Sequence, residues 1–311
     1  MTDDAQRVLI AGGGPAGMSA AVFLLAEGVP VTVLERSVTP HADPRAATYH
    51  PPTLEMFEPS GVTAELHARG IVTPHWQYRD RQNGLIAQFD LGVLAADTRY
   101  PYRLQCEQWK LTQLIKDQLD TMPHVTVHLN TKVESVDQTA DGVTTCLSTD
   151  GQVHEVKSDY LIGADGAWSA VRKSQNIEFE GFTYPERFLV VSTAFEYADH
   201  LPQLSYVNYC SDPKEWCVLL RVPTLWRVLF PTKVEETDDE VMGDESVERR
   251  LQGLLPQAVP YQTVHRTLYK VHQRVAKNFR HGRVLLAGDS AHVNNPIGGM
   301  GMNGGIHDAM N

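Results

Sequence analysis

Short apolar runs that end in glycine recur along the chain, and each predicts a buried strand that leads into a turn. The first occupies residues 7–11, precedes the glycine-rich segment 12–17, and is followed at 18–27 by a segment rich in alanine and leucine. That order predicts a strand, a tight turn and a helix. A further apolar run at 30–34 predicts a second strand beside the first.

Two later junctions repeat this arrangement. The apolar run 159–163 leads into an Asp-Gly pair at 165–166, and the segment 168–172 then has the pattern of a helix start. The apolar run 283–287 leads into a Gly-Asp pair at 288–289. Strands that alternate with helices in this way predict a parallel sheet.

The segment between 181 and 277 lacks such junctions and instead contains strand-like runs at 188–192, 216–222 and 226–230. This pattern predicts an antiparallel sheet. Asn83-Gly84 lies between possible strands at 76–81 and 85–91, which is the signal of a two-residue hairpin turn. We assign that hairpin to the same sheet.

Together these patterns predict an α/β fold in which two domains interleave along the chain. A Rossmann-like nucleotide-binding domain with a parallel sheet comprises residues 1–75, 101–180 and 276–311. A mainly antiparallel sheet that binds the substrate comprises residues 76–100 and 181–275.

Composition narrows the possible partners. The 311 residues are 42% hydrophobic and carry a formal net charge of −11, so binding to nucleic acid is not expected. Without a basic leader or a long apolar span, we expect a cytoplasmic protein with no membrane contact. The four cysteines, at 106, 146, 210 and 217, form no C-x-x-C pair, so we expect neither a metal site nor a disulfide framework.

The first glycine turn has the spacing of a dinucleotide-binding motif. Gly12, Gly14 and Gly17 fit G-x-G-x-x-G, in which the glycines permit a tight turn and a close approach of backbone to a pyrophosphate. The pyrophosphate then meets the amino end of the following helix. Glu35, 18 residues after Gly17, can hold an adenosine ribose. NAD and FAD share this half, so the motif alone does not choose between them.

The late junction supplies a second site of the same kind. Asp289 follows a strand and suits a ribityl hydroxyl, and the glycine run 298–305, which follows Pro296, lets backbone amides approach a flat ring. With G-x-G-x-x-G and the internal Asp165-Gly166, these residues resemble the flavoprotein monooxygenases of the p-hydroxybenzoate hydroxylase type. The three fingerprints of that family occur here in order, and the resemblance covers nearly the whole chain.

The resemblance implies roles for individual residues. Asp289 would hold the ribityl chain of FAD, Asp165 would support the pyrophosphate region, and Arg45 would reach the FAD diphosphate and the reduced nicotinamide. Gln108 would contact the flavin nucleotide, and Val133 would contact adenine through its backbone. The predicted cofactor-binding residues are Gly12, Gly14, Pro15, Ala16, Gly17, Glu35, Arg36, Arg45, Gln108, Val133, Asp165, Gly288, Asp289, Pro296, Gly299, Met300, Gly301, Met302 and Asn303.

Plainer roles remain open for several of these residues. Asp165 could cap the helix that begins near Trp168, because aspartate is a favoured N-cap residue. Gln108 could be an ordinary helix residue and Arg45 a surface ion-pair partner. His292 fits packing or hydrogen bonding better than the role of a base, and His50 fits a helix entry.

The activity that the resemblance implies is hydroxylation of a small aromatic, phenolic substrate with NADH or NADPH and O2, through a flavin C4a-hydroperoxide. A sheet over the flavin can provide the pocket wall, because alternate side chains point at the substrate. The candidates for that wall are Tyr209, Cys217, Leu219, Arg221 and Phe230. The sequence identifies no catalytic base.

Other functions remain possible for such a chain. A reductase, an epoxidase or a halogenase can share the fold, although no W-x-W-x-I-P segment of a halogenase surrounds Trp216 or Trp226. Relatives continue well beyond the position of Asn311, so the chain could also be a truncated flavin-binding homologue with little or no turnover. A homodimer is a further possibility.

Overall fold

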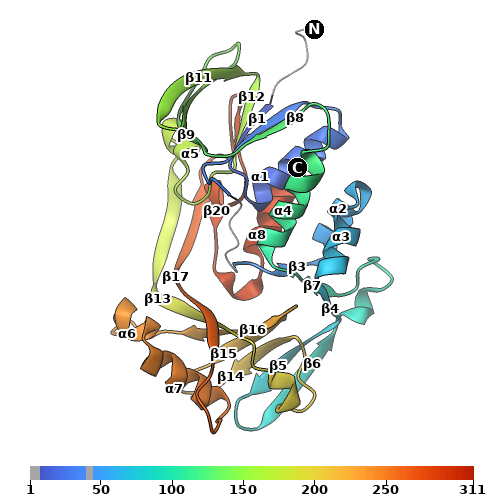
Figure 1. The fold of residues 1–311 in the computed structure, drawn as a ribbon, viewed down its shortest axis with the longest axis vertical. Helices are drawn as coiled ribbons and strands as arrows, with labels where there is room; N and C mark the ends of the chain where they lie inside the picture. The colour runs from blue at the N-terminus through green and yellow to red at the C-terminus, as the bar shows by residue number, and fades with distance from the viewer. Residues whose placement is uncertain (1–7, 40–44) are drawn as a thin grey trace.

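The computed structural model describes residues 8–39 and 45–311, and it places two sheets one above the other (Figure 1). Arg7, the first residue of the first predicted strand, lies outside the described residues. The predicted α/β fold, with a parallel sheet and an antiparallel sheet interleaved along the chain, is confirmed.

The upper sheet contains the predicted strand-turn-helix junctions. Its six strands lie in the order β18-β19-β12-β1-β2-β8, all parallel except the pair β18 and β19. The strands are β1 (Val8–Ala11), β2 (Val31–Leu34), β8 (Val125–His128), β12 (Tyr160–Gly163), β18 (Arg280–His281) and β19 (Val284–Leu286). The run of short apolar segments is explained by this sheet, because helices or a second sheet cover both of its faces.

The alternation along β1 shows how the two faces are filled. Val8 and Ile10 pack into a core with the helices α1 (Pro15–Ala26), α4 (Gln108–Leu119) and α8 (Gly301–Met310). Leu9 and Ala11 pack on the opposite side, where the covering elements are β9 (Thr131–Gln138), β10 (Val143–Thr149), β11 (Gln152–Ser158) and α5 (Ala170–Ser174). β9, β10 and β11 form an antiparallel sheet of their own.

A short helical segment and a small sheet complete the upper part. The helices α2 (Pro51–Phe57) and α3 (Val62–Arg69) pack near α4. The small sheet has the order β3-β7-β4, with β3 (Thr48–Tyr49), β7 (Arg103–Gln105) and β4 (Ile71–Thr73).

The lower sheet has eight strands in the order β20-β17-β13-β16-β15-β14-β5-β6. They are β5 (His75–Asp80), β6 (Gly84–Asp90), β13 (Phe179–Thr193), β14 (Val207–Ser211), β15 (Cys217–Val222), β16 (Leu225–Pro231), β17 (Thr263–Ala276) and β20 (His292–Val293). Neighbouring strands are antiparallel except β14 and β5. The long strands β13 and β17 run from the lower sheet up to the parallel sheet (Figure 1).

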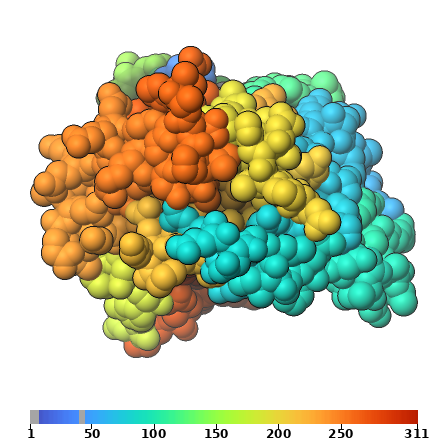
Figure 2. All heavy atoms as spheres, turned by 90° about the horizontal axis from the view of Figure 1, so that it is seen from below, coloured from blue at the N-terminus to red at the C-terminus, as the bar shows by residue number. Residues whose placement is uncertain are grey.

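One face of the lower sheet is closed by α6 (Asp238–Met242) and α7 (Asp244–Leu254). Trp226, Val228 and Phe230 of β16 pack there against apolar residues of the two helices. Seen from below, these orange helices lie beside the cyan hairpin of β5 and β6 (Figure 2). The other face of the sheet is therefore the one that can face the nucleotide-binding part.

The hairpin joins this sheet, but its turn differs from the predicted two-residue turn. β5 ends at Asp80, which pairs with Gly84, so the loop contains the three residues between them. Oδ1 of Asp80 accepts hydrogen bonds from the backbone N–H groups of Gln82 and Asn83, at 2.9 and 2.8 Å. This side-chain turn makes the corner, and Gly84, with φ of 84°, begins the second strand.

Candidate functional site

The first glycine turn forms a cradle at the amino end of α1. A Cβ atom on Gly12 would lie 2.3 Å from the carbonyl oxygen of Ala164, and one on Gly17 would lie 1.9 Å from the carbonyl oxygen of Gly12. Glycine is therefore required at both positions. A Cβ atom on Gly14 would meet no heavy atom within 4 Å, so this residue borders open space.

The amino end of α1 is also free of competing groups. Its N-cap residue is Gly14, no side chain caps the helix, and the first turn contains no acidic residue. An uncapped helix amino end with free N–H groups favours a phosphate. Pro15 and Ala16 line the cavity next to Gly14.

Glu35 lies beside this cradle. Its carboxylate accepts hydrogen bonds from the N–H groups of Gly13 at 2.6 Å and Ser37 at 2.8 Å. The carboxylate oxygens are thereby fixed and can still accept from ribose hydroxyls. Arg36 is exposed next to it, and the backbone oxygen of Glu35 accepts from Thr131 N, at the start of the strand that carries the buried Val133.

The side chain of Asp165 caps the start of α5, which is one of the two roles considered for it. Its Oδ2 accepts hydrogen bonds from the N–H groups of Ala170 at 2.7 Å and Val171 at 3.2 Å, at the start of α5. Asp165 does not line the cavity, but the next residues, Gly166 and Ala167, do. The carboxylate therefore fixes the loop that borders the cavity.

The late junction meets the first cradle from the other side. Gly288 has φ of 63°, and a Cβ atom there would lie 2.9 Å from the Cβ of Ala16, so only glycine lets the two junctions approach. Asp289 follows and opens into the cavity. Desolvation by the surrounding protein raises the pKa of the Asp289 carboxyl, whereas His292 and Arg45 act in the opposite direction.

We expect Asp289→Ala to weaken retention of FAD about ten- to hundredfold. The change would remove the charge-assisted hydrogen bond to a ribityl hydroxyl that the family resemblance implies, worth about 1.5 to 3 kcal/mol. Fluorescence titration of the flavin-free protein with FAD measures the effect. An unchanged dissociation constant would contradict the assigned role.

His292 has the hydrogen-bonding role expected for it. Its Nε2 lies 2.8 Å from Oδ2 of Asp308, which also accepts from the N–H of Gly288 at 2.9 Å. The hydrogen bond to Asp308 raises the pKa of His292 above its ordinary value of 6.5. The pair thus anchors α8 to the late junction.

This shifted pKa predicts a pH-dependent contribution to stability. Because the folded-state pKa is raised, the stabilisation is fully present below about pH 6.5 and is lost as the pH rises through the folded-state value. The melting temperature of the parent protein should therefore exceed that of His292→Gln by more at pH 6 than at pH 9. In an Asp308→Asn background the larger difference at pH 6 should shrink, because the hydrogen bond that raises the pKa of His292 is lost while the desolvation that lowers it remains. The same dependence on pH in both backgrounds would refute the linkage.

Asn303 fixes the glycine run but does not face the cavity. Its Oδ1 accepts from His50 N at 3.0 Å and from Thr53 Oγ1 at 2.7 Å. Its Nδ2 donates to the carbonyl oxygens of Thr48 and Gly299, both at 2.8 Å, and the residue is 1% exposed. The hydrogen-bonding groups of the Asn303 side chain are therefore used inside the protein, and a contact of this residue with the flavin ring stays a prediction for its backbone.

The other residues around the glycine run either line the cavity or lie outside it. Pro296, Gly299, Gly301 and Met302 line the cavity. The side chain of Met300 is 48% exposed and is not part of that lining, so its contact with the cofactor stays a prediction for its backbone. Met300 is the N-cap residue of α8.

One cavity of about 800 Å³ joins these parts to the lower sheet. This volume lies in the range of ligand-binding pockets. Arg45 and Gln108 line it, together with Arg103 and residues of six strands of the lower sheet. Burial and the nearby Arg103 lower the pKa of His50 to about 4, so this histidine is neutral at pH 7.

The floor of the cavity follows from strand register. His265, Ser192, Arg227, Leu220 and Val207 form one row of paired residues across β17, β13, β16, β15 and β14. A second row, two residues along each strand, contains Thr267, Val190, Leu229, Val218 and Tyr209. Except for Ser192, every residue of both rows lines the cavity.

Only one of the five predicted wall residues belongs to this floor. Tyr209 lines the cavity, and its hydroxyl donates to the carbonyl oxygen of Ile297 at 3.0 Å, which connects the sheet to the glycine run. Cys217, Leu219 and Phe230 are buried on the opposite face, in the core with α6 and α7. Arg221 also lies away from the cavity, 3.1 Å from Glu196.

These four assignments are wrong because side chains alternate between the faces of a strand. The sequence pattern did not indicate the residues that line the cavity instead: Val218, Leu220 and Leu229 beside them in the chain, and the polar residues Arg227, His265 and Thr267. The spacing of Trp226 and Phe230 could have indicated this. Both are large apolar residues an even number of positions apart, so they lie on the core-facing side of the strand, and Arg227 then lies on the opposite side.

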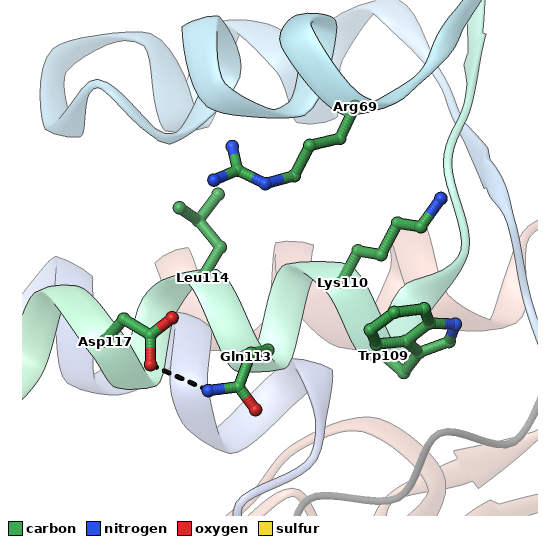
Figure 3. A pocket seen from close by; sticks show the side chains of 6 residues that line it. All are labelled: Arg69, Trp109, Lys110, Gln113, Leu114 and Asp117. Carbon is green, nitrogen blue, oxygen red and sulfur yellow. Dashed lines mark hydrogen bonds between the residues drawn. The ribbon is translucent and has the colours of Figure 1, made fainter. Parts of the chain in front are cut away.

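A second hollow lies on the outer side of α4 and is shown in Figure 3. It measures about 300 Å³ and is lined by Arg69, Trp109, Lys110, Gln113, Leu114 and Asp117. Gln113 donates to Asp117 at 2.7 Å within it. Among the described residues, none lines both this hollow and the large cavity, so the candidate site is the large cavity.

Within residues 8–39 and 45–311, no group of three or more histidine, cysteine, aspartate or glutamate side chains is placed to hold a metal ion. No helix described there is both long and apolar enough to cross a membrane.

Comparisons with known proteins agree with this geometry. Residues 5–311 match the family model described as an FAD binding domain. The para-nitrophenol 4-monooxygenase of Pseudomonas sp. (strain WBC-3) is 36% identical over 97% of this chain and 75% of that enzyme. The 6-hydroxy-3-succinoylpyridine 3-monooxygenase of Pseudomonas putida (strain DSM 28022 / S16) is 34% identical over 98% of this chain and 77% of that enzyme.

Solved structures give the same result. The p-nitrophenol 4-monooxygenase of Pseudomonas putida DLL-E4 superposes with a TM-score of 0.91 at 35% identity and covers 98% of this chain and 78% of its own. A ternary complex of aklavinone-11 hydroxylase with FAD and aklavinone superposes with a TM-score of 0.86 at 26% identity, over 99% of this chain and 61% of its own.

Proposed function

The chain belongs to the FAD-binding domain family, and from this premise we propose that it is an FAD-dependent monooxygenase that hydroxylates a phenolic ring with NADH or NADPH and O2. One observation supports this most strongly. A single cavity connects the uncapped amino end of α1 and Asp289 to a largely apolar floor that can hold an aromatic ring.

The residues at the nucleotide end fit FAD. Gly14 and the N–H groups of α1 would hold the diphosphate, Glu35 a ribose, and Asp289 the ribityl chain. The backbone of the glycine run, fixed by Asn303, would lie along the flat ring. When bound, FAD would supply the transfer of electrons from NAD(P)H and the reaction with O2.

The protein would orient the substrate and exclude water. Val190, Leu229 and Val218 provide an apolar surface in the middle of the floor, against which an aromatic ring can pack. A dry surface of this kind limits side reactions with water. Arg45, exposed and at the cavity, would meet the incoming nicotinamide cofactor as well as the diphosphate.

The test uses the protein loaded with FAD, a panel of phenols, NAD(P)H and labelled dioxygen. We expect NAD(P)H and O2 to be consumed about one to one, with one labelled oxygen atom in the aromatic product. If the protein retains FAD but no phenol in the panel acquires label, the hydroxylase proposal fails and flavin binding alone remains.

A further inference from the structure

Two cysteines lie opposite each other in the lower sheet, on the face turned away from the large cavity. Cys210 of β14 pairs with Cys217 of β15 in antiparallel register. Residues paired in this way point to the same face of a sheet, and both side chains belong to the core that α6 and α7 cover. Both are free thiols, 6% and 0% exposed. The proposed function uses neither of them.

The spacing of such a pair suits a disulfide bond. Directly opposite residues of an antiparallel sheet have Cα atoms about 4.5 to 5.5 Å apart, and disulfide-bonded cysteines have Cα atoms about 4.4 to 6.8 Å apart. Their Cβ atoms lie about 4.5 to 5.5 Å apart and must come to about 3.5 to 4.5 Å. The pair ends the ladder of β14 and β15 beside the loop 212–216, whose middle is exposed, so the strand ends have room for this small movement.

The surroundings make one thiol the nucleophile and the other its partner. A hydrogen bond with the Cys217 thiol lowers the pKa of Cys210, and Arg79 and Arg81 lower it further, against the effect of desolvation. Arg79 lies directly opposite Cys210 on β5 and is buried as well. The hydrogen bond and burial raise the pKa of Cys217, so this thiol keeps its proton. Because peroxides oxidise the thiolate form, Cys210 is the thiol that reacts first.

The other two cysteines differ from this pair. Cys146 is more exposed, but its opposite residues on the neighbouring strands are Ser135 and Glu155. Burial raises the pKa of Cys106 to about 11, so its thiol is protonated at neutral pH. Exposure alone would therefore favour oxidation of Cys146, whereas pairing favours oxidation of Cys210 and Cys217.

We propose that Cys210 and Cys217 form an oxidative modification site, at which hydrogen peroxide converts the two thiols into a reversible disulfide. The Cys210 thiolate attacks one peroxide oxygen, the O–O bond breaks, and Cys210 becomes a sulfenic acid. The Cys217 thiol then attacks that sulfur, the S–S bond forms, and the sulfenic oxygen leaves as water. The two thiols give up two protons and two electrons, and one peroxide molecule becomes two molecules of water.

The disulfide would lie directly behind the floor of the large cavity. Cys210 follows Tyr209 and Cys217 precedes Val218, and these two floor residues also pair across β14 and β15. A protein with the proposed function would release peroxide when reduced flavin reacts with O2 without hydroxylating a substrate. The site would then respond to a side product of the protein itself. The inference does not depend on that source, because the test adds the peroxide.

The test maps disulfides by mass spectrometry after the folded protein has been treated with hydrogen peroxide. Acid stops the reaction, and free thiols are blocked in urea before digestion with trypsin. Trypsin cuts after Lys214 and so separates the two cysteines into peptides 188–214 and 215–221. We expect these two peptides to be joined, with the loss of two of the four thiols. Treatment of the folded, oxidised protein with dithiothreitol should restore all four.

Variants separate this route from unspecific oxidation. In Cys217→Ala the sulfenic acid on Cys210 has no thiol opposite it, so dimedone should label Cys210, which stays unlabelled in the parent protein. In Cys210→Ala the thiol of Cys217 should remain free. Cys146→Ser is the matched control, since it removes the more exposed thiol and should leave the joined peptides unchanged.

Three outcomes would overturn the inference. The first is loss of the Cys146 thiol at peroxide concentrations that leave Cys210 and Cys217 free. The second is a disulfide that contains Cys106 or Cys146. The third is a joined pair that dithiothreitol does not reduce in the folded protein. If either alanine variant fails to fold, as thermal unfolding would show, the joined peptides of the parent and of Cys146→Ser still decide the question.

Discussion

Replacing Gly14 with aspartate is expected to lower the affinity for FAD about a hundredfold or more while the protein still folds. The backbone of Gly14 is extended, with φ of −73° and ψ of −178°, and a Cβ atom there would meet no heavy atom within 4 Å. Aspartate is a favoured N-cap residue, so its carboxylate would take the free N–H groups of α1. The same charge would repel the diphosphate from its binding site.

Titration with FAD and thermal unfolding of the flavin-free protein measure the two effects separately. The melting temperature should not fall, because an N-cap aspartate stabilises a helix by about 1 kcal/mol. Gly14→Ala is the matched control, since it adds the Cβ atom without the charge, and it should cost less than about tenfold in affinity. Equal affinities for the aspartate and alanine variants would show that the amino end of α1 does not hold the diphosphate.

Asn303→Ala is expected to lower the free energy of unfolding by about 3 kcal/mol or more. The change leaves the buried carbonyl of Thr48, the N–H of His50 and the carbonyl of Gly299 without a partner. Each buried group that loses its hydrogen bond costs about 1 to 3 kcal/mol. The glycine run would also lose its connection to α2, so FAD binding should weaken as well.

Urea denaturation of the flavin-free protein gives the free energy of unfolding. Met300→Ala, three residues earlier with a side chain that is 48% exposed, is the control and should change that free energy by less than about 0.5 kcal/mol. A similar loss of stability in both variants would show that the four hydrogen bonds of Asn303 are not the cause.

The nucleotide-binding half was predictable because its signals are local. The glycines at 12, 14 and 17 are required by backbone contacts within one strand-turn-helix unit, so their spacing alone indicates the cradle. Gly288 is likewise required by its approach to Ala16. The predicted parallel sheet follows from these junctions, and its strands match the predicted runs to within one or two residues.

The substrate half could not be predicted at the same level. An apolar run such as residues 226–230 indicates a strand, but which face is covered depends on α6 and α7, which follow later in the chain. An error of one residue in parity moves every side chain to the other face. For that reason Phe230 was assigned to the cavity, and Arg227 was overlooked.

The hydrogen-bond partners of individual polar residues could not be predicted from the sequence either. Asp165 and Asn303 both stand in the expected motifs, yet their side-chain bonds go to the protein itself, to α5 and to the segment around Thr48. A motif gives the place of a residue, whereas its hydrogen-bond partners depend on the tertiary structure.

The parallel pairing of β5 with β14 has a consequence for synthesis of the chain. Gln77 pairs with Asn208, about 130 residues later, so the hairpin leaves the ribosome long before its partner strand exists. At about 5 to 20 residues per second, the delay is roughly 10 s. During that interval the hairpin, which carries Leu85, Ile86 and Phe89 on its surface even in the folded protein, has no neighbour in the sheet. Chaperone binding during translation should therefore concentrate on this hairpin, and slower translation of residues 91–206 should increase aggregation.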